Sequence, residues 1–300
     1  MYTLLINAVC DPDKAGRLIE EVRKTTKDLP TETIIAGGDV KHLASVYSTR
    51  SFSIKTVESE EFSHAWMKLF SEAKTEYFVC LDSRITLVNS GLVTDPEQTR
   101  DRAIRHAFKR FAEMKNPAKC NYSLAPYKQT LEYLIHLLKN SHASLVFPCL
   151  LIEELANIVF YHGIGFEKGI PIPKNVKSVY HQIRTASNLR WRREFAGCLS
   201  AFAVRAVAVK VNKHDFDEPH LFGMDLQLQV RGNGGLIYST TDAAVWLSGK
   251  TPTPDSDLIL ASRERSIEDK FLERWQESEL LAVESLYTED RQIIQKFSVK

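Results

Sequence analysis

The sequence predicts an α/β fold in which a mostly parallel sheet is flanked by helices, with a helical insertion and a carboxyl-terminal helical tail. Three observations lead to this expectation. Short apolar runs alternate with amphipathic helical patterns over the first ninety residues, an apolar run at 143–152 follows a helical stretch, and apolar residues recur at helical spacing near the carboxyl end. Strands that alternate with helices pair in parallel and carry helices on both faces.

The amino-terminal elements follow one another closely. Strand, helix, strand, strand, helix and strand are predicted, in that order, at 3–9, 14–24, 33–36, 52–57, 62–73 and 77–81. In such sheets ligands bind beyond the carboxyl ends of the strands. We therefore expect residues 7–9, 37–39 and 82–84 to lie on one ligand-binding rim.

Composition limits the class of protein. The chain has 300 residues, 44% of them hydrophobic and 26% charged, as in ordinary globular proteins. A formal net charge of +1 argues against a strong general attraction to nucleic acid or an anionic membrane. The five cysteines form no CxxC pair, which is typical of thiols in a reducing compartment. With no apolar run of bilayer length and no basic leader at Met1, we expect a cytoplasmic protein without a transmembrane segment.

The carboxyl half contains an ordered series of motifs. A small-residue stretch at 197–200 is followed by a Phe-Asp-Glu turn at 216–218. Asp225 then stands before an apolar helical pattern, which leads to Arg231 and to a glycine pair at 234–235. This order resembles the acceptor-side half of a GT-A glycosyltransferase of the family 2 type. In that family an acidic pair opens the helix.

The amino-terminal half shows a matching pattern. A helix containing Trp66 leads to a strand that closes on Leu81-Asp82-Ser83-Arg84, which is similar to the Leu-Asp-x-Asp of the same family. The joint order of these motifs over roughly two thirds of the chain carries the resemblance, because no single motif is specific.

The resemblance implies a GT-A-like, Rossmann-like domain in four parts. These are a nucleotide-sugar-binding half, a helical insertion, an acceptor-side half, and a loop with a helical tail, at 1–94, 95–142, 143–250 and 251–300.

The activity implied by the resemblance is inverting transfer of a hexose or pentose from a nucleotide-sugar donor to a hydroxyl acceptor. Asp225 would be the general base that takes the acceptor proton. The donor-binding residues would be Ala8, Asp39, Asp82 and Arg84, and the acceptor-side residues would be Gly197, Asp217 and Met224. The sequence does not distinguish a glycan, protein, lipid or nucleic-acid acceptor.

Three positions depart from the family pattern. Asp39 follows its strand two positions late, Met224 replaces the acid before the base, and Arg84 replaces the second acid of a DxD motif, which is therefore degenerate. The resemblance implies a bound manganese or magnesium ion, but the guanidinium of Arg84 cannot ligate a cation. Asp82 is thus the one candidate metal ligand. The sequence requires no cofactor, and manganese or magnesium is the ion expected if one binds. Arg84 could instead offset the charge of the leaving diphosphate, giving metal-independent transfer.

Other interpretations remain open at this stage. The protein could be a catalytically inactive GT-A-like protein that binds a nucleotide or glycan. Arg84 could be a surface arginine paired with a carboxylate, and Asp225 could be a helix N-cap. A nucleotidyltransferase is disfavoured because no glycine-rich basic loop follows the first strand.

Overall fold

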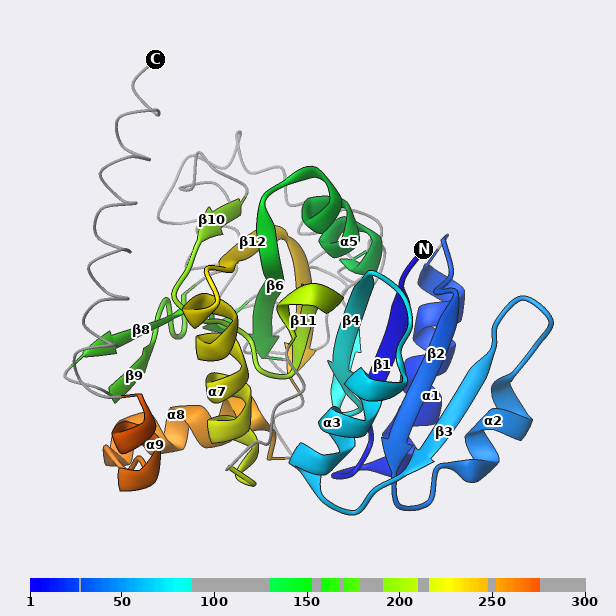
Figure 1. Ribbon diagram of the computed structural model, residues 1–300, viewed down its shortest axis with the longest axis horizontal. Helices are drawn as coiled ribbons and strands as arrows, with labels where there is room; N and C mark the ends of the chain where they lie inside the picture. Colours follow the sequence, from blue (N-terminus) through cyan, green and yellow to red (C-terminus); the bar gives the residue numbers. More distant parts are fainter. Residues whose placement is uncertain are drawn as a thin grey trace, which may run out of the picture.

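The computed structural model describes most of the chain (Figure 1). The described residues are 1–26, 28–87, 130–152, 158–167, 170–178, 191–209, 216–247 and 252–275. None of the helices in these ranges combines the length and apolarity that a membrane crossing requires.

The strands of the described ranges form a ten-stranded sheet and a separate two-stranded hairpin. They are β1 (Thr3–Asn7), β2 (Glu32–Gly37), β3 (Ile54–Glu58), β4 (Tyr77–Asp82), β5 (Ile85–Leu87), β6 (Ala143–Ile152), β7 (Val159–Tyr161), β8 (Ile164–Glu167), β9 (Ile170–Pro173), β10 (Trp191–Arg193), β11 (Ala201–Arg205) and β12 (Leu236–Leu247).

The large sheet runs in the order β10-β12-β6-β11-β4-β1-β2-β3, with β5 paired to β12 and β7 to β6, while β8 and β9 form the hairpin. Strands β3, β2, β1 and β4 are mutually parallel. Antiparallel β11 separates them from β6 and β12, which are parallel to each other and run in the same direction as β4. The expected α/β class with a mostly parallel sheet is therefore confirmed.

Helices cover both faces of this sheet (Figure 1). They are α1 (Pro12–Thr25), α2 (Lys41–Tyr47), α3 (Phe62–Glu72), α5 (Thr130–Asn140), α7 (Pro219–Gly232), α8 (Pro254–Glu264) and α9 (Asp269–Arg274), with a short 3-10 turn at Ala206–Ala208. Helices α3 and α7 pack on one face, where the rings of Phe62 and Phe222 meet edge to face with centroids 6.4 Å apart. Helix α5 packs across β4, β6, β11 and β12.

Local sequence explains where the main helices begin. Asp11 caps α1 by accepting a hydrogen bond from the backbone N–H of Lys14 at 3.2 Å. Pro12, Pro219 and Pro254 occupy first-turn positions, where the missing N–H of proline costs nothing. The buried faces of these elements merge into one apolar core that runs through the sheet.

The domain boundaries stay a prediction. Residues 95–129 of the expected insertion lie outside the described residues. The described part, α5, belongs to the layer that covers the sheet. The loop expected at the start of 251–300 is partly helical, because Thr253 caps α8 by accepting from the N–H of Ser256 at 3.2 Å.

Candidate functional site

The carboxyl ends of β1 and β4 lie side by side. Asn7, the last residue of β1, is in register with Ala36 of β2 and with Asp82 of β4. The side chain of Asn7 donates to the carbonyl of Phe62 at 3.0 Å and accepts from the N–H of Val9 at 3.2 Å. This network fixes the turn after β1, and Ala8 follows it with its backbone N–H bonded to the carbonyl of Ala36 at 2.7 Å.

Asp82 and Arg84 form a buried ion pair on this rim. Arg84 Nε donates to Asp82 Oδ1 and Arg84 Nη2 donates to Asp82 Oδ2, both at 2.8 Å. The backbone N–H of Arg84 adds a third bond to Asp82 Oδ1 at 2.9 Å. The side chains of Asp82 and Arg84 are 1% and 6% exposed, so Arg84 is not the surface arginine that one interpretation of the sequence proposed.

The rest of the Arg84 guanidinium faces the segment before α8. Arg84 Nη1 donates to the carbonyl oxygen of Pro252. Burial lowers the pKa of Arg84, but the hydrogen bonds and charge of Asp82 outweigh it, so the net direction is upward. Arg84 is therefore a fixed positive charge that joins the end of β4 to the segment leading into α8.

Cys10 is an exposed thiol beside this ion pair. Although its surface is exposed, partial desolvation raises the pKa of the Cys10 thiol, and the nearby Arg84 guanidinium opposes that rise. The reactivity of the Cys10 thiol therefore depends on the surroundings of Arg84.

Asp39 follows the carboxyl end of β2, at the same edge of the sheet, but its side chain points into solvent. Its side chain is 95% exposed, and its nearest ionic partner is His42, with 3.8 Å between Asp39 Oδ1 and His42 Nδ1. The structure thus brings Ala8, Asp82 and Arg84 together at the ends of adjacent strands and leaves Asp39 free in solvent beside β2.

The described part of the chain contains no cluster of three or more His, Cys, Asp or Glu side chains suited to a metal ion. Both carboxylate oxygens of Asp82 already bind Arg84. A divalent cation needs several oxygen ligands, so the residues present do not fit the manganese or magnesium that the family resemblance would bring.

Asp225 lies in a second polar cluster, on α7. Its side chain is fully buried, and Oδ1 accepts from Trp275 Nε1 at 2.9 Å while Oδ2 accepts from Gln229 Nε2 at 2.7 Å. Arg274 Nε lies 3.0 Å from Asp225 Oδ1. Two of these partners come from α9 and its carboxyl end, so Asp225 ties the two helices together.

Asp225 does not cap or open the helix. Helix α7 begins at Pro219 after Glu218, and Asp225 lies in its second turn. The expected start was wrong because Pro219 supplies an earlier and favourable first position. The N-cap interpretation of Asp225 is excluded as well.

The three acceptor-side residues occupy different environments. Gly197 is packed in the core, where a built Cβ would lie 2.0 Å from the ring of Phe147, and its N–H donates to Gln227 Oε1 at 2.8 Å. Met224 is buried on α7. Asp217 is exposed and accepts from Ser63 Oγ at 3.0 Å, joining the turn before α7 to α3. Two of the three residues are thus buried and one is exposed.

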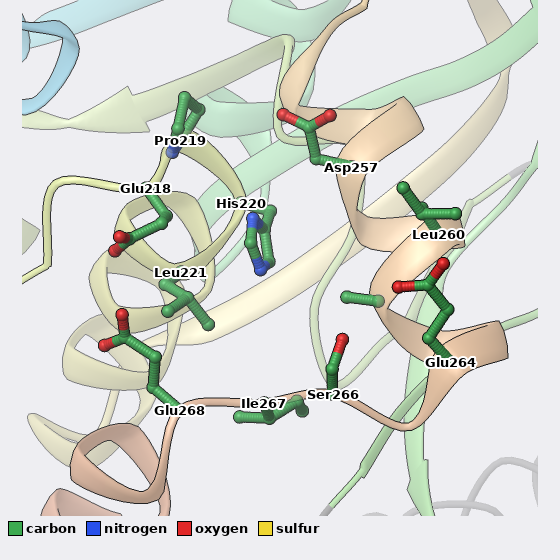
Figure 2. Close-up of a pocket in the computed structure, with 11 residues that line it drawn as sticks. Glu218, Pro219, His220, Leu221, Asp257, Leu260, Glu264, Ser266, Ile267 and Glu268 are labelled. Carbon is green, nitrogen blue, oxygen red and sulfur yellow. The ribbon is translucent and has the colours of Figure 1, made fainter.

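A cavity of about 520 Å³ lies between the start of α7, α8 and the segment before α9 (Figure 2). Its walls combine leucine and isoleucine side chains with four carboxylates, from Glu218, Asp257, Glu264 and Glu268. His220 also lines the cavity, and burial lowers the pKa of its imidazole against the opposing charges of Asp257 and Glu218.

The functional interest of several residues in this region could not be predicted from the sequence. Cys10, Asp257, Arg274 and Trp275 carry no motif that marks them as functional. Trp275 belongs to the apolar helical pattern near the carboxyl end, which predicts only that it packs against the fold. Its contact with Asp225 depends on the fold, because the two are fifty residues apart.

No protein-family model matches the sequence, and no curated protein is significantly similar to it. Solved structures with a similar arrangement include GalNAc-T7 with UDP, GalNAc and Mn2+, at 11% identity and a TM-score of 0.48, covering 88% of this chain and 48% of that one. S. aureus TarS 1-349 matches at 10% identity and a TM-score of 0.45, covering 82% and 60%.

A third similar structure is glucosyl-3-phosphoglycerate synthase from Mycobacterium tuberculosis in complex with phosphoglyceric acid. It matches at 9% identity and a TM-score of 0.42, covering 90% of this chain and 81% of that one. The present chain spans about half the length of the GalNAc-T7 chain. At this level of similarity the matches do not assign a family.

Proposed function

We propose that the protein is a glycosyltransferase that moves a sugar from a nucleotide-activated donor to a hydroxyl acceptor. The observation that supports this most is the place of the Asp82–Arg84 pair. Chain order reverses between β1 and β4, since β2 and β3 lie on one side of β1 and β4 on the other. In open α/β sheets the crevice at such a reversal is the usual ligand site.

The chemistry of the rim suits a nucleotide diphosphate. The backbone turn after β1 brings Ala8 close to Asp82, and Arg84 supplies a permanent positive charge at the same strand end. A diphosphate that approached Arg84 would compete with Asp82 and Pro252 for the guanidinium. Donor binding therefore involves rearrangement of this ion pair, with Arg84 in the role that a metal would otherwise take.

The proposed reaction is a single displacement with inversion. The acceptor oxygen forms a bond to the anomeric carbon as the bond to the diphosphate oxygen breaks, the nucleoside diphosphate leaves with the electron pair, and Asp225 takes the acceptor proton. A positioned base of this kind contributes about 10²–10⁴ in rate. The cavity beside Asp257 is the proposed acceptor site, because it lies against the start of α7, the helix that carries Asp225.

A second candidate function is a catalytically inactive protein that binds a nucleotide or glycan on the same fold. One observation favours it. Asp225 has no exposed surface, and its two carboxylate oxygens are bonded to Gln229 and Trp275.

A panel of nucleotides and nucleotide sugars distinguishes the two candidates. Thermal shift with and without EDTA measures binding, and release of the nucleoside diphosphate measures transfer. We expect one donor to stabilise the protein and to be turned over, and Asp225→Asn to lower turnover by about 10²–10⁴ while binding stays unchanged. Binding without turnover of any donor would favour the inactive protein, and no binding at all would argue against both a glycosyltransferase and an inactive nucleotide-binding protein.

A further inference from the structure

The contact between Asp225 and α9 goes beyond ordinary helix packing. Trp275 Nε1 and Arg274 Nε approach the same oxygen, Asp225 Oδ1, at 2.9 and 3.0 Å. Asp225 is fully buried, whereas the Arg274 side chain is 29% exposed. The carboxylate that is proposed to meet the acceptor is thus covered by the end of a short helix near the surface.

Within the described part of the chain, α9 is anchored by the packing of Phe271 and Trp275. Its one buried apolar side chain is Phe271, whose ring lies 5.3 Å from that of Phe216. The Arg274 guanidinium lies 5.7 Å from the centre of the Phe216 ring. A helix of six residues has little stability of its own, so its position depends on tertiary contacts. These include the ring contacts of Phe216, the packing of Trp275 against the core and the two bonds to Asp225.

The same helix adjoins the cavity of Figure 2. Ser266, Ile267 and Glu268, which connect α8 to α9, form one wall of that cavity, and Leu221 of α7 forms part of another. Leu221 and Asp225 are four residues apart in α7 and therefore lie on one face of the helix. A molecule in the cavity that touches Leu221 is about one helical turn, roughly 5–6 Å, from Asp225.

We propose that α9 is a latch that closes the site: Arg274 and Trp275 occupy Asp225, and an acceptor reaches this carboxylate only after α9 has moved away. The inference rests on the proposed function, because that function assigns Asp225 as the base. The latch also explains how a base without exposed surface can serve an acceptor from solution. A fixed contact that only orients Asp225 is the competing explanation.

Trp275→Phe tests the latch without relying on catalysis. The substitution removes one hydrogen bond to a carboxylate and keeps an aromatic ring. Bonds to charged groups contribute enough to change an opening equilibrium by about tenfold or more. We expect hydrogen exchange of the backbone amides of 269–275 to accelerate about tenfold, with no change in β1 and β4. The matched control is Trp246→Phe on β12, which should leave exchange in α9 unchanged.

Carboxylate labelling measures access to Asp225 itself. With a carbodiimide and glycine ethyl ester, labelling of Asp225 should rise in Trp275→Phe by the same factor as amide exchange in α9, because both require the same opening. Unchanged exchange in α9, or labelling of Asp225 only when the whole domain unfolds, would overturn the latch.

Turnover then separates a latch from a fixed contact. With the donor that the nucleotide-sugar panel identifies and water as acceptor, Trp275→Phe should raise the rate of donor hydrolysis. A lower rate would show that Trp275 orients the base, and the latch would be rejected. If no variant turns over any donor, the proposed function fails, while exchange and labelling still decide whether α9 opens over Asp225.

Discussion

Arg84 holds both carboxylate oxygens of Asp82, with Nε and Nη2 each 2.8 Å from their acceptors, at the carboxyl end of β4. The two side chains are almost completely buried, so they neutralise each other inside the protein. Removing only one of them would leave an unpaired buried charge, which is more destabilising than the loss of the pair itself. Experiments on this pair therefore need variants that change both residues.

Nucleotide binding should not depend on a divalent cation. Since Arg84 would supply the positive charge that a metal otherwise brings to the diphosphate, we expect the nucleotide-induced thermal shift to be the same in EDTA and in millimolar manganese. The double variant Asp82→Asn/Arg84→Gln should lose that shift, because it keeps approximate shape and removes both charges. A shift that appears only with manganese would contradict the role given to Arg84.

Cys10 offers a chemical test of where the nucleotide binds. It is exposed beside Arg84, whereas Cys80, Cys149 and Cys198 are buried. A maleimide should modify Cys10 before those three, and a saturating nucleotide should slow that modification severalfold. Mass spectrometry of the modified peptide provides the measurement, with Cys10→Ser as the control. Modification at an equal rate with bound nucleotide would place the nucleotide elsewhere.

Gly197 should be intolerant of any side chain. A Cβ at this position would lie 2.0 Å from ring atoms of Phe147 in the core. We expect Gly197→Ala to destabilise the fold by about 1–3 kcal/mol or more, since overpacking forces neighbouring groups to shift. Urea unfolding measures the change. Gly38→Ala is the matched control, because a Cβ there meets no atom within 4 Å.

His162 should make stability depend on acid pH. Burial, and secondarily the charge of Arg192, lower the pKa of His162 from 6.5 to about 3. Below about pH 6.5 the imidazole of His162 is protonated in the unfolded chain but stays neutral in the folded protein. Because the unfolded chain then binds the additional proton, the free energy of unfolding is highest above that pH and falls as the pH drops toward 3. His162→Gln should flatten the dependence of unfolding free energy on pH between these values. An unchanged slope, measured by urea unfolding across that range, would show that His162 titrates normally in the fold.

The sequence by itself determined the layers of the fold. Apolar runs at β1, β2 and β4 and the apolar faces of α1 and α3 are local patterns, and their period follows from backbone geometry. The placement of Ala8 and Asp82 on one rim also followed from sequence, because the carboxyl ends of adjacent parallel strands meet at one edge.

Tertiary structure alone decided what the polar side chains bind. The sequence could place Arg84 two residues after Asp82, but not show that the guanidinium turns back onto both oxygens. Asp225 matched a helix-opening motif, yet Pro219 started the helix earlier and carried Asp225 into its interior. Trp275 reaches that carboxylate from fifty positions away. The spacing of apolar residues predicts which face of a helix or strand is buried. The partner of a buried charge depends instead on packing between elements that are distant in the chain.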